Sequence, residues 1–254
     1  MGAKQFQKSF VLTVAESKRL IARGVARSEV VETALKDGIV AVAKGTTNGY
    51  IAEELLGESI HKPDYCTGTT RPPGRESEVK VANKLPDLVI RNGERWEGVS
   101  ATESVDEMGP GDVFIKGANA LNYDREQAGI LIGHPTGGTI GAAIGSLISR
   151  RGVLLLPVGL EKSIPGDLYR TSHAVNAMAE AGSGPSLWPV SGLIFTELEA
   201  LETLTDVTAM PLAAGGILGA EGSVRVSAWG TEKEIESAES IVEEIRGEPP
   251  FGND

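Results

Sequence analysis

The sequence contains a single cysteine, and this scarcity excludes two kinds of stabilisation. Cys66 is the only cysteine among 254 residues, so neither an intrachain disulfide nor a zinc site with several cysteine ligands can form. The three histidines, His61, His134 and His173, lie too far apart for the helical spacing of a metal motif. We therefore predict no metal site and no cofactor, and we expect a chain suited to the reducing cytoplasm.

Long apolar runs and basic stripes are also missing. No segment approaches the roughly 20 apolar residues of a membrane-spanning helix, and the start, MGAKQFQKSF, lacks the apolar core of a secretory signal. The formal net charge of −11 opposes the phosphate backbone of nucleic acid. We expect a cytoplasmic protein without membrane or nucleic-acid partners, whose partner is a small molecule; a homo-oligomer stays open.

The pattern of apolar residues predicts an α/β fold. Thr13 and Glu16 have the spacing of a capping box and begin a helix to about Val25, and Ser28 and Gly38 bound a second helix. Since strands and helices alternate, we predict a mainly parallel sheet with helices on both faces. Continuous apolar runs predict its buried strands at residues 39–43, 113–115, 129–132 and 153–158.

The last quarter of the chain has another pattern. Two predicted strands, at residues 207–211 and 224–228, are joined by a connection too short for a parallel crossover, so they should pair antiparallel. A strand at residues 193–195 and helices at residues 197–204 and 232–245 complete this part. The predicted domains are an α/β core over residues 1–184, a small α+β unit over residues 185–247 and a flexible tail over residues 248–254.

Three polar segments that contain glycine come after predicted core strands. They cover residues 44–49, 116–119 and 134–139. Since the carboxyl ends of parallel strands meet at one edge of a sheet, we predict that these segments line one pocket. The predicted ligand-binding residues are Lys44, Gly45, Thr46, Thr47, Asn48, Lys116, Gly117, Asn119, Thr136, Gly137, Gly138 and Thr139.

The chemistry of these segments favours an anion. Glycines let the backbone approach a ligand, and threonine hydroxyls and the N–H groups of helix N-termini donate to phosphate or carboxylate. Lys116 would point into the crevice, Asn119 could bond a sugar hydroxyl, and His134 is a group that titrates near neutral pH. The alternative is a set of ordinary strand-to-helix turns with a solvated lysine and a buried, hydrogen-bonded histidine.

The order of the three segments resembles a superfamily of phosphosugar enzymes. It includes ribose-5-phosphate isomerase, glucosamine-6-phosphate deaminase, methylthioribose-1-phosphate isomerase, initiation-factor 2B subunits and CoA transferases. Residues 45–48 are similar to the phosphate-binding Gly-Thr-Gly-Ser-Thr loop, residues 116–119 stand where the isomerases have Asp-Gly-Ala-Asp, and residues 137–139 are similar to a later glycine-rich loop. The resemblance spans residues 38–158 and implies a sugar-phosphate ligand.

The chain departs from that superfamily at the catalytic motif. Where the isomerases carry two carboxylates for proton transfer, this chain has Lys116 and Asn119. The resemblance therefore does not imply isomerisation by the family mechanism. The cysteine of the methylthioribose-phosphate branch has no clear counterpart in Cys66.

Residues 57–99 supply further candidates and one turn. The polar loop at residues 57–75 contains His61, Asp64, Cys66, Arg71 and Arg75. Its arginines could clamp an anion, and Cys66 would be nucleophilic if a cation lowered its pKa; the alternative is a surface loop with an unreactive thiol.

The dipeptide at residues 92–93, Asn-Gly, predicts a hairpin. Charged residues near other strand ends are interpreted as solvated: Asp124, Glu126, Glu161 and Lys162.

The sequence is compatible with three functional hypotheses. The first is an isomerase-like or transferase-like enzyme that binds a small anionic metabolite, with His134, Lys116, Asn119 and Cys66 as candidate catalytic residues. The second is a metabolite sensor or regulatory subunit without catalysis. The third is a CoA transferase, which would need a nucleophilic Glu that the sequence does not identify.

Overall fold

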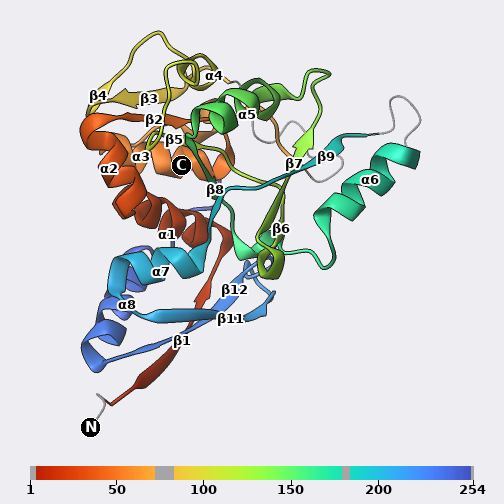
Figure 1. The fold of residues 1–254 in the computed structure, drawn as a ribbon. Coiled ribbons are helices and arrows are strands. Elements are labelled where there is room, and N and C mark those ends of the chain that lie inside the picture. The colour runs from red at the N-terminus through yellow and green to blue at the C-terminus, as the bar shows by residue number, and fades with distance from the viewer. Residues whose placement is uncertain (1–3, 72–82, 179–183, 253–254) are drawn as a thin grey trace.

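The structure is a computed structural model that describes residues 4–71, 83–178 and 184–252 (Figure 1). The helices are α1 (Val14–Arg27), α2 (Glu29–Asp37), α3 (Thr46–Leu56), α4 (Ala101–Ser104), α5 (Gly138–Arg150), α6 (Leu168–Met178), α7 (Glu197–Thr205) and α8 (Glu232–Glu244), with short 3-10 turns η1 (Lys62–Tyr65), η2 (Tyr123–Arg125) and η3 (Leu160–Lys162). The strands are β1 (Phe6–Leu12), β2 (Ile39–Val42), β3 (Leu88–Arg91), β4 (Glu94–Arg95), β5 (Val113–Ile115), β6 (Ala120–Asn122), β7 (Gln127–Ile132), β8 (Val153–Pro157), β9 (Ser186–Val190), β10 (Leu193–Phe195), β11 (Thr208–Ala214) and β12 (Val224–Gly230).

The central sheet has six strands in the order β10-β8-β5-β2-β3-β4. β10, β8, β5 and β2 run parallel, and β3 and β4 extend the edge antiparallel. Every residue of β2 and β5 is buried, which explains why these strands are continuous apolar runs. The chain is therefore an α/β protein whose main sheet is mostly parallel.

The predicted hairpin is confirmed between β3 and β4. Its two turn residues, Asn92 and Gly93, have φ of 52° and 79°, the left-handed values that a type I′ turn requires at both positions. The helix predicted after Thr13 is also confirmed, because the Thr13 hydroxyl accepts from the Glu16 N–H and the Glu16 carboxylate accepts from the Thr13 N–H.

The strand predicted at residues 129–132 exists as β7, but its place in the parallel core was wrong. β7 pairs antiparallel with β6 on one side and with β9 on the other, in a separate three-stranded sheet. Only residues 123–126 connect β6 to β7, which is far too short for the crossover between parallel strands. In Figure 1 this sheet and α6 extend away from the central sheet.

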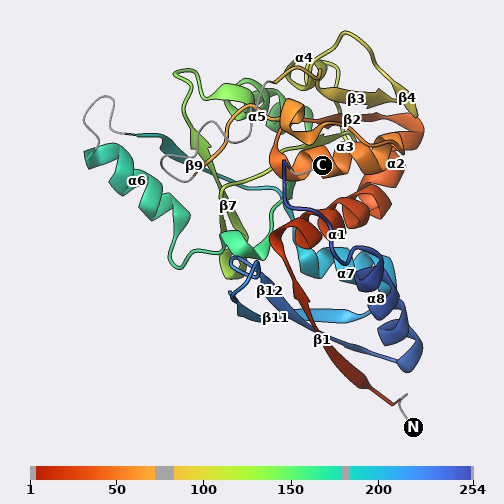
Figure 2. The same ribbon diagram turned by 180° about the vertical axis from the view of Figure 1, so that it is seen from behind.

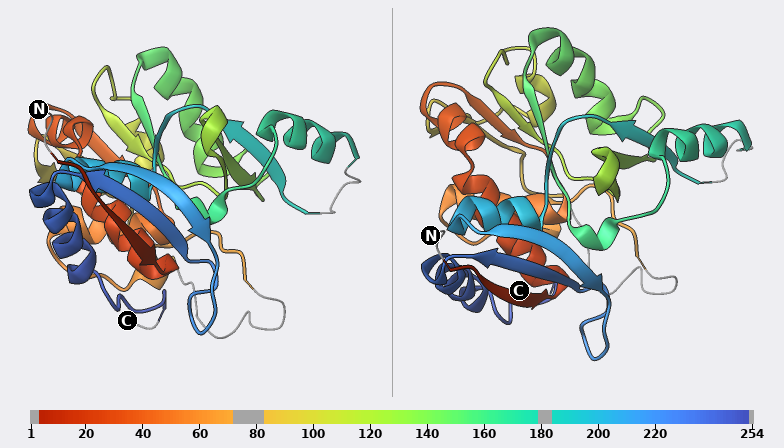
Figure 3. Two further views of the ribbon diagram at one scale, coloured as in Figure 1. Left: turned by 90° about the horizontal axis from the view of Figure 1, so that it is seen from below. Right: turned by 60° about the horizontal axis from the view of Figure 1, so that its bottom comes forward.

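A third sheet is built from both ends of the chain. Its order is β1-β12-β11, and β11 pairs antiparallel with β12 as predicted (Figure 3). β1, which was not predicted from the sequence, pairs with β12 along its whole length. β10, predicted to belong with the C-terminal strands, instead pairs parallel with β8 in the central sheet. The segment over residues 185–247 thus supplies strands to all three sheets.

The helix α1 lies at the centre of the helical packing, against α3 and α7. At Gly24 a Cβ atom would lie 2.7 Å from the Cα of Ala200 in α7, so only glycine permits this approach of the two helices. None of the helices in the described residues has the length and hydrophobicity that a membrane crossing requires.

The segment expected to be a flexible tail contacts the body as far as Phe251 (Figure 2). Glu248 forms an ion pair of 2.9 Å with Arg19 of α1, and the N–H of Gly247 donates to Glu16 over 2.9 Å. Lys18 lies over the Phe251 ring, 5.5 Å from its centre. These contacts hold residues 247–251 against α1, whose charged side chains Glu16, Lys18 and Arg19 are their partners.

Candidate functional site

A cavity of about 620 Å³ lies at the carboxyl ends of β2 and β5 and beside β7. The three predicted segments all line it, which confirms that they meet at one pocket. Although β7 is outside the parallel sheet, Asn119 ties it to the end of β5: the Asn119 N–H donates to the Gly129 carbonyl over 2.8 Å, and its Oδ1 accepts from Leu131 over 3.0 Å. This link places the start of α5 at the same cavity.

Two helices begin at the cavity without a side-chain cap. α3 starts at Thr46, with Gly45 as its N-cap. Gly137 is the N-cap of α5, with a φ of 86° that favours glycine. In the described residues neither helix has a side-chain capping bond, whereas α1, α4, α7 and α8 all begin with a capping box. Their first N–H groups lack intrahelical acceptors, so they are available to an anion.

Asn48 joins the ends of β2 and β5 below the cavity. Its side chain is completely buried, and its Nδ2 donates to the carbonyls of Ala43 and Ile115 over 2.6 and 3.2 Å. These two acceptors fix the orientation of the amide. Its Oδ1 is buried and has no hydrogen-bond partner within the described residues. Asn48 lines the cavity, so an acceptor without a partner in the described residues lies at its wall, next to the donors at the start of α3.

The charged side chains of the cavity wall are all cationic. They are Lys44, Lys116 and Lys162, and no carboxylate of the described residues lines the cavity. Lys44 donates to Asn83 over 2.6 Å and Lys162 pairs with Glu161 over 2.8 Å. The wall of a chain with a net charge of −11 thus has a local positive potential.

Lys116 differs from the other two lysines. Its hydrogen bond in the described residues is to the carbonyl of Gly117, over 3.2 Å, and it has no carboxylate partner there. Burial lowers the pKa of Lys116 to about 8, because desolvation disfavours the charged amine. A substantial fraction of this amine is neutral at mildly alkaline pH.

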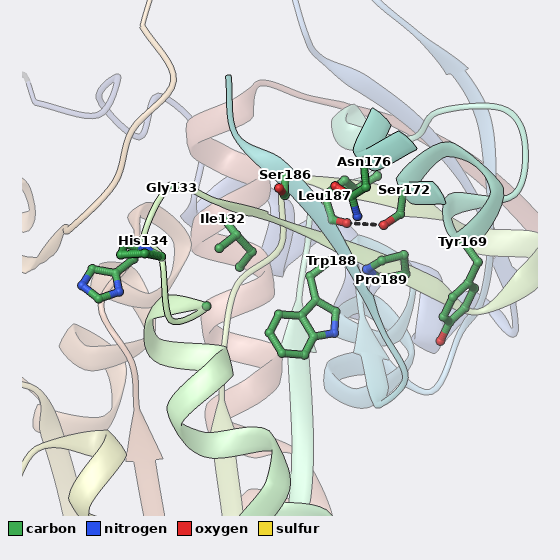
Figure 4. Close-up of a pocket in the computed structure, with 12 residues that line it drawn as sticks. Ile132, Gly133, His134, Tyr169, Ser172, Asn176, Ser186, Leu187, Trp188 and Pro189 are labelled. Carbon is green, nitrogen blue, oxygen red and sulfur yellow. Dashed lines mark hydrogen bonds between the residues drawn. The ribbon is translucent and has the colours of Figure 1, made fainter. Parts of the chain in front are cut away.

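His134 lies at the border of this cavity and a second one. Its Nδ1 contacts the Thr136 hydroxyl over 2.9 Å, and Thr136, predicted to bind ligand, is absent from the lining of the main cavity. The second cavity, of about 690 Å³, is lined by uncharged residues and His134. In Figure 4 Trp188 lies between His134 and Tyr169. His134 is exposed, so the alternative of a buried histidine was wrong.

A cluster of titratable groups that was not predicted from the sequence surrounds Lys162 of the cavity wall. Glu161 and Lys162, interpreted as solvated, have side chains only 14% and 23% exposed. The Glu161 carboxylate folds back over Gly159, where a Cβ atom would lie 1.8 Å from its Oε2. Burial and the Lys162 charge lower the pKa of Lys18 to about 8. These residues come from α1 and η3, so no local motif reveals the cluster.

Cys66 lies in the same region as a buried thiol. It is fully buried, and its Sγ lies 3.6 Å from the Lys62 carbonyl. Burial raises the pKa of the thiol to about 11 despite the opposing charge of Lys18, and a protonated thiol is a poor nucleophile. The geometry favours the alternative of an unreactive thiol. Its neighbours at residues 67–70, which were not predicted to bind ligand, line the cavity with three threonines.

Glu197 at the start of α7 is a buried acid of the same region. It has no exposed surface, its Oε2 accepts from the Leu160 N–H over 2.9 Å, and its Oε1 has no partner in the described residues. Burial and the negative charge of Glu161 raise the pKa of Glu197 to about 7. Its carboxyl group is therefore largely protonated below neutral pH.

Replacing Glu197 with Gln should remove a pH dependence of stability. Since the folded pKa of about 7 exceeds the ordinary 4.5, this carboxyl stabilises the fold fully below pH 4.5, and that contribution is lost as the pH rises through 7. We expect the variant to gain about 2 to 4 kcal/mol relative to wild type between pH 4.5 and pH 8, measured by urea unfolding. Glu236→Gln, at an exposed position of α8, should give no such gain; equal pH profiles for Glu197→Gln and wild type would contradict the assignment.

The remaining candidates among the described residues do not line the cavity. His61 is exposed and contacts Asp64 over 3.0 Å, Arg71 donates to Thr69 over 3.0 Å, and Arg75 is outside the described residues. Asp124, Glu126 and His173 are exposed, which agrees with solvated roles for the two acids.

The arrangement offers hydrogen-bond donors and cations around the cavity. Within residues 4–71, 83–178 and 184–252, no group of three or more His, Cys, Asp or Glu side chains is placed to hold a metal ion. A comparison of the chain with protein-family models, with curated proteins and with solved structures finds no match.

Proposed function

We propose that this protein binds a small anionic metabolite, such as a sugar phosphate, in the cavity at the ends of β2 and β5. The observation that carries the proposal is the composition of the wall: three lysines and the starts of two uncapped helices face a space without a carboxylate in the described residues. A phosphate group would accept from the N–H groups of α3 and α5, since helix N-termini favour anions.

A phosphorylated polyol suits the site better than a bare anion. The buried Oδ1 of Asn48 needs a donor, and a ligand hydroxyl would supply one. Threonine hydroxyls at residues 46, 47, 67, 69, 70 and 139 add further partners around the space. The resemblance to the phosphosugar superfamily supports the same ligand class, and we propose a relationship to it.

An enzyme would transform the bound metabolite, whereas a sensor would only hold it. Two titratable groups of the cavity wall favour an enzyme with acid–base chemistry: Lys116, whose pKa burial lowers to about 8, and Lys162, which pairs with Glu161. A sensor remains the second candidate, because Lys116 and Asn119 replace the catalytic acids of the resembled isomerases. A CoA transferase gains no support, since no Glu of the described residues lines the cavity.

Replacing Lys116 with Ala should weaken phosphate binding by about 1.5 to 3 kcal/mol, the usual range for a hydrogen bond to a charged group. Calorimetry with inorganic phosphate, ribose 5-phosphate and an acyl-CoA would measure this effect. Lys233→Ala, at an exposed position of α8, is the control and should bind as wild type does. Turnover of a bound sugar phosphate would support an enzyme and binding without turnover a sensor, whereas a folded wild type that binds none of these anions would refute the proposal.

A further inference from the structure

We propose that Lys116 is a nucleophilic amine that forms an imine with an aldehyde or ketone group of the anionic ligand. The inference rests on the proposed function, and it narrows the ligand class to anions that carry a carbonyl group, such as aldehyde phosphates and 2-oxo acids.

The environment of Lys116 distinguishes it from the other cavity lysines. The Lys44 ammonium donates to the Asn83 side chain, and the Lys162 ammonium forms an ion pair with Glu161. Lys116 has only the weak contact of 3.2 Å to the carbonyl of its own neighbour Gly117 among the described residues. Since no ion pair holds its nitrogen there, the amine can approach a carbonyl carbon in the cavity.

The cavity wall also favours the neutral form of this amine. Its titratable groups in the described residues are Lys44, Lys116, Lys162 and His134, and none of them is an acid that would hold a proton on Lys116. Burial places the pKa of Lys116 at about 8. Desolvation of a lysine is a known route to an amine nucleophile.

The step balances without an external oxidant or reductant. The neutral Lys116 nitrogen donates its electron pair to the carbonyl carbon, the carbonyl oxygen takes a proton, and the nitrogen loses one, which gives a carbinolamine. Loss of the hydroxyl group with a proton as water then gives the imine. The ammonium of Lys162, in the same wall and paired with Glu161 over 2.8 Å, can supply the proton to the oxygen.

Borohydride trapping tests the inference directly. Wild type is incubated with D-glyceraldehyde 3-phosphate or glyoxylate, treated with sodium borohydride and mapped by peptide mass spectrometry. We expect the reduced adduct at Lys116 at least tenfold above that at any other lysine, with competition by inorganic phosphate. The rate of adduct formation should rise as the pH passes through about 8, since the amine loses its proton there.

A variant of Lys116 and a matched control distinguish the need for an amine from the need for a positive charge. Lys116→Arg keeps a positive charge but cannot form the imine, so its adduct should vanish, while Lys233→Arg on α8 should label as wild type does. An even spread of label over exposed lysines, or label at Lys116 that phosphate does not compete with, would overturn the inference. If wild type binds phosphate by calorimetry but gives no adduct, only the inference fails; if it binds no anion, the proposed function fails as well.

Discussion

Replacing Asn48 with Asp is expected to abolish phosphate binding and to lower the free energy of unfolding by about 3 to 5 kcal/mol, the range for an uncompensated buried charge. Asp lacks the N–H groups that bond the carbonyls of Ala43 and Ile115. The new carboxylate would lie beside two carbonyl oxygens at a fully buried position. It would also place a negative charge at the start of α3, where the anion should bind.

Asn48→Ala is the matched control for this prediction. It removes the same two donors without adding a charge, so it should lower the free energy of unfolding by only about 1 to 3 kcal/mol. Urea unfolding at pH 8 measures the stability of both variants, and calorimetry under conditions where both are folded measures phosphate binding. If Asn48→Asp bound phosphate as tightly as Asn48→Ala, the anion would not lie at the start of α3.

Replacing Arg19 with Ala should lower the free energy of unfolding by about 3 kcal/mol or more, since it breaks a largely buried ion network. The Arg19 guanidinium pairs with Glu53, Glu54 and Glu248 over 2.6, 2.9 and 2.9 Å. It also lies over the ring of Tyr50, 4.8 Å from its centre. Arg19 thereby holds α1, α3 and the C-terminal segment together.

The carboxylate of Glu53 explains the size of the effect. Its side chain is only 6% exposed, and burial by itself favours the neutral form of the carboxyl group. Hydrogen bonds from Arg19, the Ile60 N–H and Lys62 outweigh burial, so the pKa of Glu53 is lowered. Without Arg19 this buried charge loses its closest partner. Urea unfolding of Arg19→Ala against Arg23→Ala measures the effect. Arg23 lies on the same helix as Arg19, but it pairs at the surface with Glu244 of α8 over 2.8 Å, so we expect Arg23→Ala to cost less than about 1 kcal/mol. Equal losses in the two variants would show that the network adds nothing beyond a surface pair.

Local sequence patterns determined the elements that depend on neighbouring residues. The capping box at Thr13, the turn at residues 92–93 and the buried runs of β2 and β5 all formed where they were predicted. In each of these elements the physical cause lies within a few residues of the pattern. The segments at residues 44–49 and 116–119 also meet at one cavity as predicted, because they follow neighbouring parallel strands. The segment at residues 134–139 reaches the cavity for another reason, since Asn119 ties β7 to the end of β5.

Only the tertiary structure decided which strands share a sheet and which charges meet. β1 pairs with β12, about 220 residues away along the chain, and β10 returns to β8 rather than to β11. In the same way Lys18, Glu161 and Glu197 meet behind the cavity from α1, η3 and α7. A short run of residues determines its own preference for helix, strand or turn. The strand pairs and the charge cluster depend instead on burial and pairing between segments far apart in the chain, so no local pattern predicts them.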